Sequence, residues 1–408
     1  MQNTKISYLI SRYPAISHTF ILREVVHLKS MGLELITASV NKTNRIDEKL
    51  THEEINEKNL TFYIKEAGFI GAVKSKTALV LRSPLKLLKT FLYAIKTAGP
   101  NLKMQLYHQL YLIEAIMVAD WMYKNSSKYL HVHFASEVAT VGMFVKKLNG
   151  CHLSITVHGP DEFYNADKYL LEEKINTADK IFCISDFARS QLMKLSEYDQ
   201  WEKFCITRLG VDTDTFKPNE KSAHKTPNIL SVGRLCPAKA QHILIEAAAI
   251  LVKSGLDFTI TFVGDGPDRS SLEELCNTLS LNQIITFTGS VNHDQVKDFY
   301  NESDIFCLPS FAEGIPIVLM EAMSKKIPCV TSRITGIPEL IDSGVDGLLT
   351  APSNAEELAQ ALQTLIESET LRKEIGMAAR DKIIEKYHLE KNMTYFGHKL
   401  KESVTNSD

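Results

Sequence analysis

The stretch that decides the fold runs from residue 228 to residue 263 and has the sequence NILSVGRLCPAKAQHILIEAAAILVKSGLDFTITFV. Two short apolar runs, Asn228 to Val232 and Phe258 to Val263, flank a longer segment, Gln241 to Lys253, with apolar residues at helical spacing. Short continuous apolar runs are typical of buried parallel strands, and a helix between two of them makes the crossover. The stretch therefore predicts a βαβ unit of a doubly wound α/β sheet.

The same alternation recurs along the whole chain. A length of 408 residues allows two or three domains at roughly 150 residues each, and two such sheets fit. The polar stretch Thr213 to Pro227 separates two βα-rich halves and is the expected linker. We expect domains at 1–212 and 213–385, and a C-terminal helix at 386–408 that returns to the first domain. The other predicted strands are Ile6 to Ile10, Leu35 to Val40, Ser154 to Val157, Lys180 to Ile184, Ile284 to Thr288, Ile305 to Leu308 and Pro328 to Thr331.

Composition excludes several classes of function. The formal net charge of -3, from 46 basic and 49 acidic residues, provides no overall field that would attract nucleic acid. The 7 cysteines stand singly without a C-x-x-C pair, which indicates buried thiols in a reducing compartment rather than disulfides or structural zinc. The N-terminus lacks a long apolar segment, and no apolar run reaches about 18 residues. We therefore expect a cytoplasmic protein that does not span a membrane.

One region interrupts the alternation. Lys65 to Lys103 carries eight basic residues and the single acid Glu66, interleaved with apolar residues such as Leu81, Leu88 and Phe91. This is a basic amphipathic pattern with two interpretations. Either it is a solvated face on helices whose apolar side joins the first core, or it contacts an anionic membrane surface.

The segment Ser231-Val-Gly233-Arg234-Leu235, followed by Lys239, comes directly after a predicted strand. Gly233 would permit a sharp turn at the carboxyl end of the strand, where open α/β sheets bind ligands. Arg234 and Lys239 would supply two cations at a phosphate site. The later segment Val263-Gly-Asp-Gly-Pro267 resembles a dinucleotide fingerprint, but Arg269 replaces its third glycine, so a tight turn is the better interpretation.

The most informative stretch is residues 309–323, PSFAEGIPIVLMEAM. The pattern predicts a loop with Glu313 at the mouth of a helix that carries Glu321. Apolar neighbours on both sides of Glu321 indicate a buried helix, on which a carboxylate needs a partner. Ligand hydroxyls would be such partners, whereas a capping acid and a solvated glutamate are the alternatives.

Together these pieces resemble the retaining, Leloir-type glycosyltransferases of the GT-B fold, family 4, and in particular the branch that builds bacterial exopolysaccharides such as colanic acid. Ala240 departs from the pattern, because this family usually has glycine after the lysine. The motifs are the E-x7-E of Glu313 and Glu321, G-R-L with Lys239, Gly264-Asp-Gly-Pro267, Phe287-Thr-Gly-Ser-Val291, Gly336-Ile-Pro-Glu339, Arg12 to Glu24, His131-Val-His133, Thr156-Val-His158-Gly-Pro-Asp161, Ile184-Ser185-Asp-Phe-Ala-Arg189 and Leu209-Gly-Val-Asp212.

The resemblance implies two doubly wound Rossmann-like domains facing each other across a crevice, with a nucleotide-diphospho-sugar held by the second. Arg234 and Lys239 would neutralise the leaving diphosphate. Glu313 would bind donor-sugar hydroxyls and Glu321 the ribose, whose paired hydroxyls suit a carboxylate. The remaining donor-site residues implied are Gly233, Val291 near the base, and Gly314, Ile315, Ile317 and Val318 through their backbone groups.

The resemblance also implies residues from the first domain. His158 would meet the donor sugar, and Asp161 would lie near the acceptor. A histidine after a strand is otherwise more often a satisfied structural residue. Further candidates on the acceptor side are Ser17, His133, Ser185 and Arg189.

Retention in this fold is thought to proceed by same-face attack assisted by the diphosphate, so no enzyme nucleophile, cofactor or metal is expected. Asp212-Thr-Asp214 spells the metal motif of another glycosyltransferase fold, but its place near the linker indicates a turn.

The expected function is transfer of a hexose from a nucleotide sugar, with UDP favoured and GDP-mannose as the other option, to a sugar or polyprenyl-diphosphate-linked glycan acceptor. The expected location is the cytoplasm, with peripheral attachment to the inner face of the membrane. The alternatives are a nucleotide-sugar epimerase of the same fold and a noncatalytic nucleotide-sugar-binding subunit. A phosphorylase is disfavoured, because the chain shows no lysine context for pyridoxal phosphate.

Overall fold

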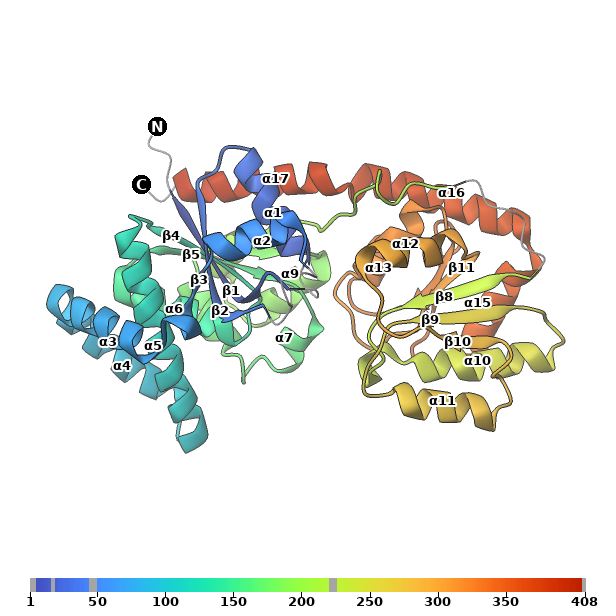
Figure 1. Ribbon diagram of the computed structural model, residues 1–408, viewed down its shortest axis with the longest axis horizontal. Helices are drawn as coiled ribbons and strands as arrows, with labels where there is room; N and C mark the ends of the chain where they lie inside the picture. Colours follow the sequence, from blue (N-terminus) through green and yellow to red (C-terminus); the bar gives the residue numbers. More distant parts are fainter. Residues whose placement is uncertain (1–4, 16–18, 44–49, 220–225, 406–408) are drawn as a thin grey trace. The chain divides into compact units, whose positions relative to one another are not determined.

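The computed structural model describes residues 5–15, 19–43, 50–219 and 226–405, and these form two compact α/β units (Figure 1). The first unit comprises residues 1–184, 188–207 and 393–408, and the second comprises residues 185–187 and 208–392. The candidate Ser17 and linker residues 220–225 lie outside the described residues.

In its described part, the first unit contains a seven-stranded sheet in the order β3-β2-β1-β4-β5-β6-β7, and every paired neighbour is parallel. The four strands predicted in this half are confirmed as β1, β2, β5 and β6. The pattern missed β4, whose apolar run is interrupted by two histidines, and also β3 and β7, which are very short. The strands are β1 (Ile6–Tyr13), β2 (Leu35–Lys42), β3 (Phe62–Tyr63), β4 (Tyr129–His133), β5 (His152–Val157), β6 (Lys180–Cys183) and β7 (Phe204–Ile206).

Helices cover both faces of this sheet. One core cluster gathers α5 and α6 with the inner strands, and a second gathers α1 with β1. Phe396 and Leu400 of α17 belong to the second cluster, where the Phe396 ring meets Phe182 edge-on at 4.9 Å. The helices are α1 (Thr19–Ser30), α2 (His52–Leu60), α3 (Ile64–Arg82), α4 (Pro84–Ala98), α5 (Leu102–Lys124), α6 (Glu137–Asn149), α7 (Pro160–Tyr164), α8 (Leu171–Thr177), α9 (Asp186–Lys194), the 3-10 helix η3 (Tyr198–Lys203) and α17 (Leu389–Thr405).

The second unit contains, within the described ranges, a six-stranded parallel sheet in the order β10-β9-β8-β11-β12-β13. All five strands predicted in this half are present, and only the three-residue β13 was missed. The quoted stretch 228–263 forms β8, α10 and β9, the predicted βαβ unit. The strands are β8 (Asn228–Val232), β9 (Thr259–Val263), β10 (Ile285–Phe287), β11 (Ile305–Leu308), β12 (Cys329–Ser332) and β13 (Leu348–Thr350).

Two apolar clusters on opposite faces of this sheet form the core of the second unit. Phe216 is fully buried in one of them. The described beginning of the expected linker therefore packs against this unit; it comprises Thr213 to Asn219. The helices are the 3-10 helix η4 (Pro237–Lys239), α10 (Gln241–Lys253), α11 (Arg269–Thr278), α12 (His293–Asn301), α13 (Ile317–Ser324), α14 (Ile337–Leu340), α15 (Ala355–Glu367) and α16 (Glu369–Lys386).

The basic stretch Lys65 to Lys103 spans α3 and α4, and its basic side chains are exposed. Its apolar side chains only partly join the core, because Phe69, Leu81 and Leu85 are 83%, 80% and 72% exposed. A solvated basic face with a buried apolar side therefore does not account for all of this stretch, because several of its large apolar side chains are exposed. Among the described residues, none of the helices has the length and apolar content needed to cross a membrane.

Candidate functional site

The turn after β8 is fixed by backbone packing against the segment after β9. The amide of Gly233 donates to the carbonyl of Val263 at 3.0 Å, and that of Leu235 donates to Asp265 at 3.0 Å. A Cβ on Gly264 would lie 2.0 Å from the Gly233 carbonyl oxygen, and one on Gly266 would lie 2.0 Å from the Leu235 oxygen. The two glycines therefore serve close backbone approach, which agrees with the predicted tight turn.

An ion pair between Lys239 and Glu313 connects the segments that follow β8 and β11. Lys239 Nζ lies 2.5 Å from Glu313 Oε1, and the Ser310 hydroxyl donates to the same oxygen at 2.7 Å. The next residue, Ala240, has φ of 50°, a left-handed conformation that favours glycine. Lys239 thus comes with a buried carboxylate as its partner, while Arg234 is exposed.

Glu321 has its partner within the protein. It is buried on α13 and accepts a hydrogen bond of 2.9 Å from the Tyr300 hydroxyl of α12. Burial and the nearby Glu321 carboxylate hold the pKa of Tyr300 well above its ordinary value, so this phenol stays a donor. The sequence predicts that a carboxylate at this position needs a partner. The structure provides one within the protein, the Tyr300 hydroxyl, where a ligand was expected.

The other donor-site candidates lie on the same loops. Ile315 is buried in the core, whereas Ile317 and Val318 are partly exposed in the first turn of α13. Val291 is partly exposed beyond β10 and packs on the same core cluster. Gly314 touches the loop after β12, since a Cβ on Gly336 would lie 2.8 Å from its carbonyl oxygen.

Asp212 and Asp214 form the turn that the sequence predicts. Asp212 Oδ1 accepts from the amides of Asp214 and Thr215, both at 3.0 Å, and Oδ2 accepts from the Thr215 hydroxyl at 2.6 Å. The Asp212 carboxylate is thus occupied by its own turn.

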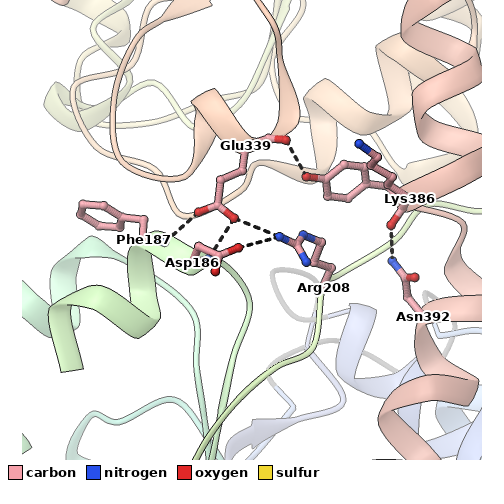
Figure 2. Close-up of polar contacts among 7 residues, drawn as sticks. Asp186, Phe187, Arg208, Glu339, Lys386 and Asn392 are labelled. Atoms are coloured by element: carbon pink, nitrogen blue, oxygen red, sulfur yellow. Dashed lines mark hydrogen bonds and ion pairs between the residues drawn. The ribbon is translucent and has the colours of Figure 1, made fainter. Parts of the chain in front are cut away.

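Glu339 accepts hydrogen bonds from residues 186 and 187, which belong with it to the second unit, as Figure 2 shows. Its carboxylate accepts from the amides of Asp186 at 2.9 Å and Phe187 at 2.7 Å. Arg208 donates to Asp186 at 2.7 Å and approaches Glu339 at 3.4 Å. The candidate Ser185 precedes residues 186 and 187 and is buried, and the candidate Arg189 follows them along the chain and is partly exposed.

In the first unit, His133 and His158 lie side by side at the ends of β4 and β5. His133 Nδ1 and His158 Nε2 are 3.1 Å apart, and His133 Nε2 lies 2.9 Å from Glu24 Oε1 of α1. His133 is fully buried and His158 is 8% exposed, whereas Asp161 is exposed in the first turn of α7. The structure thus brings two of the predicted residues together and adds Glu24.

A buried acid and a buried lysine support the loops that follow β4 and β5. Glu162 accepts from the amides of His158 at 2.7 Å, Gly159 at 3.0 Å and Ala135. Lys174 donates to the carbonyls of Ala135 at 2.9 Å, Ser136 at 2.7 Å and Tyr169. Burial raises the pKa of Glu162 and lowers the pKa of Lys174 to about 7.

Glu24, His131 and His133 could hold a metal by distance alone, since their ligand atoms lie within 4.8 Å of one another. However, both ring nitrogens of His131 already meet hydroxyls, Ser154 at 2.7 Å and Thr156 at 3.2 Å. Burial keeps the pKa of His131 well below its ordinary value. The three residues therefore form a hydrogen-bonded network, and a metal would have to displace existing bonds.

Sequence reasoning assigned no role to Glu24, Tyr300 or Glu339. Glu24 and Glu339 stand at the ends of quoted motifs, and this position was the signal in the sequence that could have identified them. The sequence carries no such signal for Tyr300, because a tyrosine near the end of an amphipathic helix is ordinary.

Comparison with known proteins shows what this chain is similar to. Residues 212–382 match the family described as Glycosyl transferases group 1. The amylovoran biosynthesis glycosyltransferase AmsK of Erwinia amylovora is 27% identical over 401 residues, covering 93% of this chain and 95% of AmsK.

Two solved structures show the fold. A glycosyltransferase from Rickettsia africae has a TM-score of 0.70 at 20% identity, covering 99% of this chain and 100% of its own. HepE from Anabaena, solved in complex with UDP, has a TM-score of 0.72 at 16% identity, covering 98% and 100%. The chain therefore has the GT-B fold, with two Rossmann-like parallel-sheet units.

We predict that Lys174→Met lowers the free energy of unfolding by about 3 kcal/mol or more, because buried carbonyls lose their donor. The loss should grow above pH 7. In the unfolded chain the lysine keeps its proton up to about pH 10.4, whereas in the folded protein it loses the proton near pH 7. Between these two values the unfolded state binds more protons, so the free energy of unfolding of the wild type rises by up to about 1.4 kcal/mol per pH unit. Urea unfolding of both proteins at pH 6.5 and pH 8.5 measures this difference.

Lys168→Met, at an exposed lysine near the same loops, is the matched control and should change stability by less than about 0.5 kcal/mol at both pH values. An equal loss for Lys174→Met at pH 6.5 and 8.5 would contradict the lowered pKa.

Proposed function

We propose, from the Glycosyl transferases group 1 domain that the chain carries, that it is a retaining hexosyltransferase of exopolysaccharide or cell-surface glycan biosynthesis. The donor is a nucleotide-diphospho-sugar, with UDP favoured over GDP. The observation that carries the proposal is the Lys239–Glu313 ion pair beside the first turn of α13, inside the matched segment. The name of AmsK and the UDP complex of HepE support the pathway and the nucleotide.

In this proposal the second unit binds the donor. Arg234 and Lys239 neutralise the charge that grows on the diphosphate as the glycosidic bond breaks, and fixed cations stabilise that state most. Glu321, oriented by Tyr300, accepts from the ribose hydroxyls. Glu313 accepts from the sugar hydroxyls and holds Lys239 in place. The nucleotide base lies near Val291, and backbone groups of Gly233, Gly314, Ile315, Ile317 and Val318 complete the donor site.

The first unit contributes the acceptor side and one donor contact. His158 binds the donor sugar, and Asp161, Ser17 and His133 are the acceptor-side candidates together with Ser185 and Arg189. The acceptor hydroxyl attacks on the face that the diphosphate leaves, and a diphosphate oxygen takes its proton. No protein nucleophile and no metal take part, because the two cations serve the leaving group.

We also propose that α3 and α4 hold the protein on an anionic membrane, where a polyprenyl-diphosphate-linked acceptor would be found. The exposed Leu81, Leu85 and Leu88 lie among exposed lysines. Nearby, Val80, Leu87, Phe91 and Ile113 line an apolar groove of about 400 Å³ between α3, α4 and α5. Large exposed apolar patches ringed by basic residues are typical of membrane-surface contacts.

Of three predictions on function, the first tests the proposed donor. UDP at about 100 times its dissociation constant should stabilise the protein by about 2.7 kcal/mol in a thermal-shift titration, equally with EDTA and with magnesium. Screening UDP-sugars and GDP-sugars then identifies the donor, and its consumption should require a glycan acceptor.

Loss of binding or turnover in EDTA would contradict the metal-free mechanism. Release of free nucleotide without acceptor would indicate an epimerase, and no consumption at all a binding subunit.

A second prediction separates the two glutamates. Glu321→Gln should weaken both UDP and the UDP-sugar by about 1.5 to 3 kcal/mol, because ribose is common to both ligands. Glu313→Gln should spare UDP, since Lys239 then loses its competing carboxylate, and should weaken only the sugar donor. Calorimetric titration of both ligands into both variants decides this. Equal weakening of UDP by both substitutions would contradict the assigned roles.

The third prediction concerns the membrane. The protein should float with phosphatidylglycerol vesicles at low salt and release as salt rises, because each basic residue near the surface contributes about 1 kcal/mol. Replacing Lys86 and Lys89 with Glu should lower binding about tenfold or more, whereas Lys253→Glu, at an exposed lysine of the second unit, should not. If the protein does not float with the vesicles, the stretch is better explained as a solvated face, and a soluble acceptor is favoured.

A further inference from the structure

A cavity of the first unit lies at the edge of the sheet where β4 and β5 begin. It has a volume of about 590 Å³, and its lining comes mostly from α3, α4, α5 and the segments that lead into these two strands. His133 and His158 lie at the other ends of the same strands. Because β4 and β5 are parallel, the cavity is at the opposite edge of the sheet from the two histidines and is separate from their site.

An arginine and two lysines line this cavity, and none of its described lining residues is acidic. They are Arg82 at the end of α3, Lys86 in the first turn of α4 and Lys128 directly before β4. Lys86 reaches across to the turn between α6 and β5, since a Cβ on Gly150 would lie 3.7 Å from its Nζ. In the described part of the chain, the Nζ atoms of Lys86 and Lys128 have neither a hydrogen bond nor an ion pair, so both can bind an anion.

Arg82 is held in place by its own neighbours. Its guanidinium donates to the buried Asp120 at 2.9 Å and lies 3.8 Å from the centre of the Tyr123 ring. Asp120 also pairs with Lys124 at 2.6 Å, so this carboxylate has two cations of its own and does not neutralise the cavity. A guanidinium has five N–H donors, and Arg82 therefore keeps donors for a ligand while its position is fixed.

The apolar groove between α3, α4 and α5 borders this cavity. Leu79 lines the cavity and Val80 lines the groove, and in the same way Ser83 lines the cavity and Pro84 the groove. A cationic cavity beside an apolar groove matches a ligand that has an anionic head and an apolar chain. The groove distinguishes such a ligand from free phosphate, which has no chain to bury.

We propose that the cavity and the groove together bind one lipid with a terminal phosphate group, such as phosphatidic acid, with its phosphate against Arg82, Lys86 and Lys128. A terminal phosphate has three acceptor oxygens and about 1.5 to 2 negative charges at pH 7, which suits three cationic donors better than the single charge of a phosphodiester head. The inference rests on the proposed attachment of α3 and α4 to an anionic membrane, and it names the lipid that this attachment selects. Because the site is at the edge opposite His133 and His158, the lipid is an anchor and not the acceptor.

Calorimetric titration with dihexanoyl phosphatidic acid, kept monomeric, tests the site without a membrane. Lys86→Gln combined with Lys128→Gln should weaken binding about tenfold or more, because two charge-assisted hydrogen bonds are lost. Both lysines are exposed, and thermal unfolding confirms that the variant is folded. Lys89→Gln combined with Lys96→Gln is the matched control: it removes the same charge from exposed lysines of α4 outside the cavity lining and should change the affinity less than about twofold. Equal weakening by both double variants would show a diffuse basic surface and overturn the site.

Two further ligands separate the head from the chain. Inorganic phosphate lacks the chains and dihexanoyl phosphatidylcholine lacks the net charge, so both should bind more weakly than the short phosphatidic acid. Leu88→Gln, in the groove, should weaken the lipid and leave inorganic phosphate unchanged, whereas Leu85→Gln, at another exposed leucine of α4 that does not line the groove, should change neither. If inorganic phosphate or phosphatidylcholine binds as tightly as phosphatidic acid, the proposal is overturned.

Flotation distinguishes this proposal from the membrane attachment on which it rests. At equal negative charge, vesicles with phosphatidic acid should bind the wild type more tightly than vesicles with phosphatidylglycerol, and the variant with Lys86→Gln and Lys128→Gln should lose this difference. If the wild type binds both kinds of vesicle alike, the attachment stands and the phosphate site is overturned. If it binds neither, the attachment and the anchoring role both fail, whereas the calorimetric titration still decides whether the cavity binds the phosphate.

Discussion

The second unit is organised around one steric constraint. Residues 233–235 pack against residues 264–266 with no room for a side chain, because a Cβ on Gly264 or Gly266 would lie 2.0 Å from an opposing carbonyl oxygen. This packing holds the turn after β8 at the edge of the sheet. From there Lys239 can reach Glu313 on the loop after β11. The charged pair at the edge of the sheet thus depends on the glycines beside it.

The first unit achieves similar order with buried polar groups. Glu162 accepts from three amides and Lys174 donates to three carbonyls, and together they hold the loops after β4 and β5. Unpaired buried polar groups are costly, so such a network stabilises one arrangement and disfavours partial ones. His133 ends β4 and His158 begins the loop after β5, where its backbone amide bonds to Glu162.

The sequence predicted most of the fold because buried parallel strands leave a strong local signal. It missed β3, β7 and β13, which are too short to produce a periodic pattern, and β4, whose histidines interrupt the apolar run. The turns and helices that carry the candidate residues were predicted, since they are local. The partners of those residues were not. Tyr300 and Glu24 reach the candidates Glu321 and His133 only through tertiary packing, at 21 and 109 residues along the chain.

The candidate carboxylates and the surface of α3 and α4 both depart from ordinary burial. Glu24, Glu313 and Glu321 are buried carboxylates, and each has a donor close enough to bond. Conversely, Phe69 and Leu81 are large apolar residues left mostly in solvent. Neither arrangement favours folding, because buried charge and exposed apolar surface both carry a free-energy cost. Sites that break local rules in this way are usually functional, so the carboxylates and the surface of α3 and α4 are where recognition is expected.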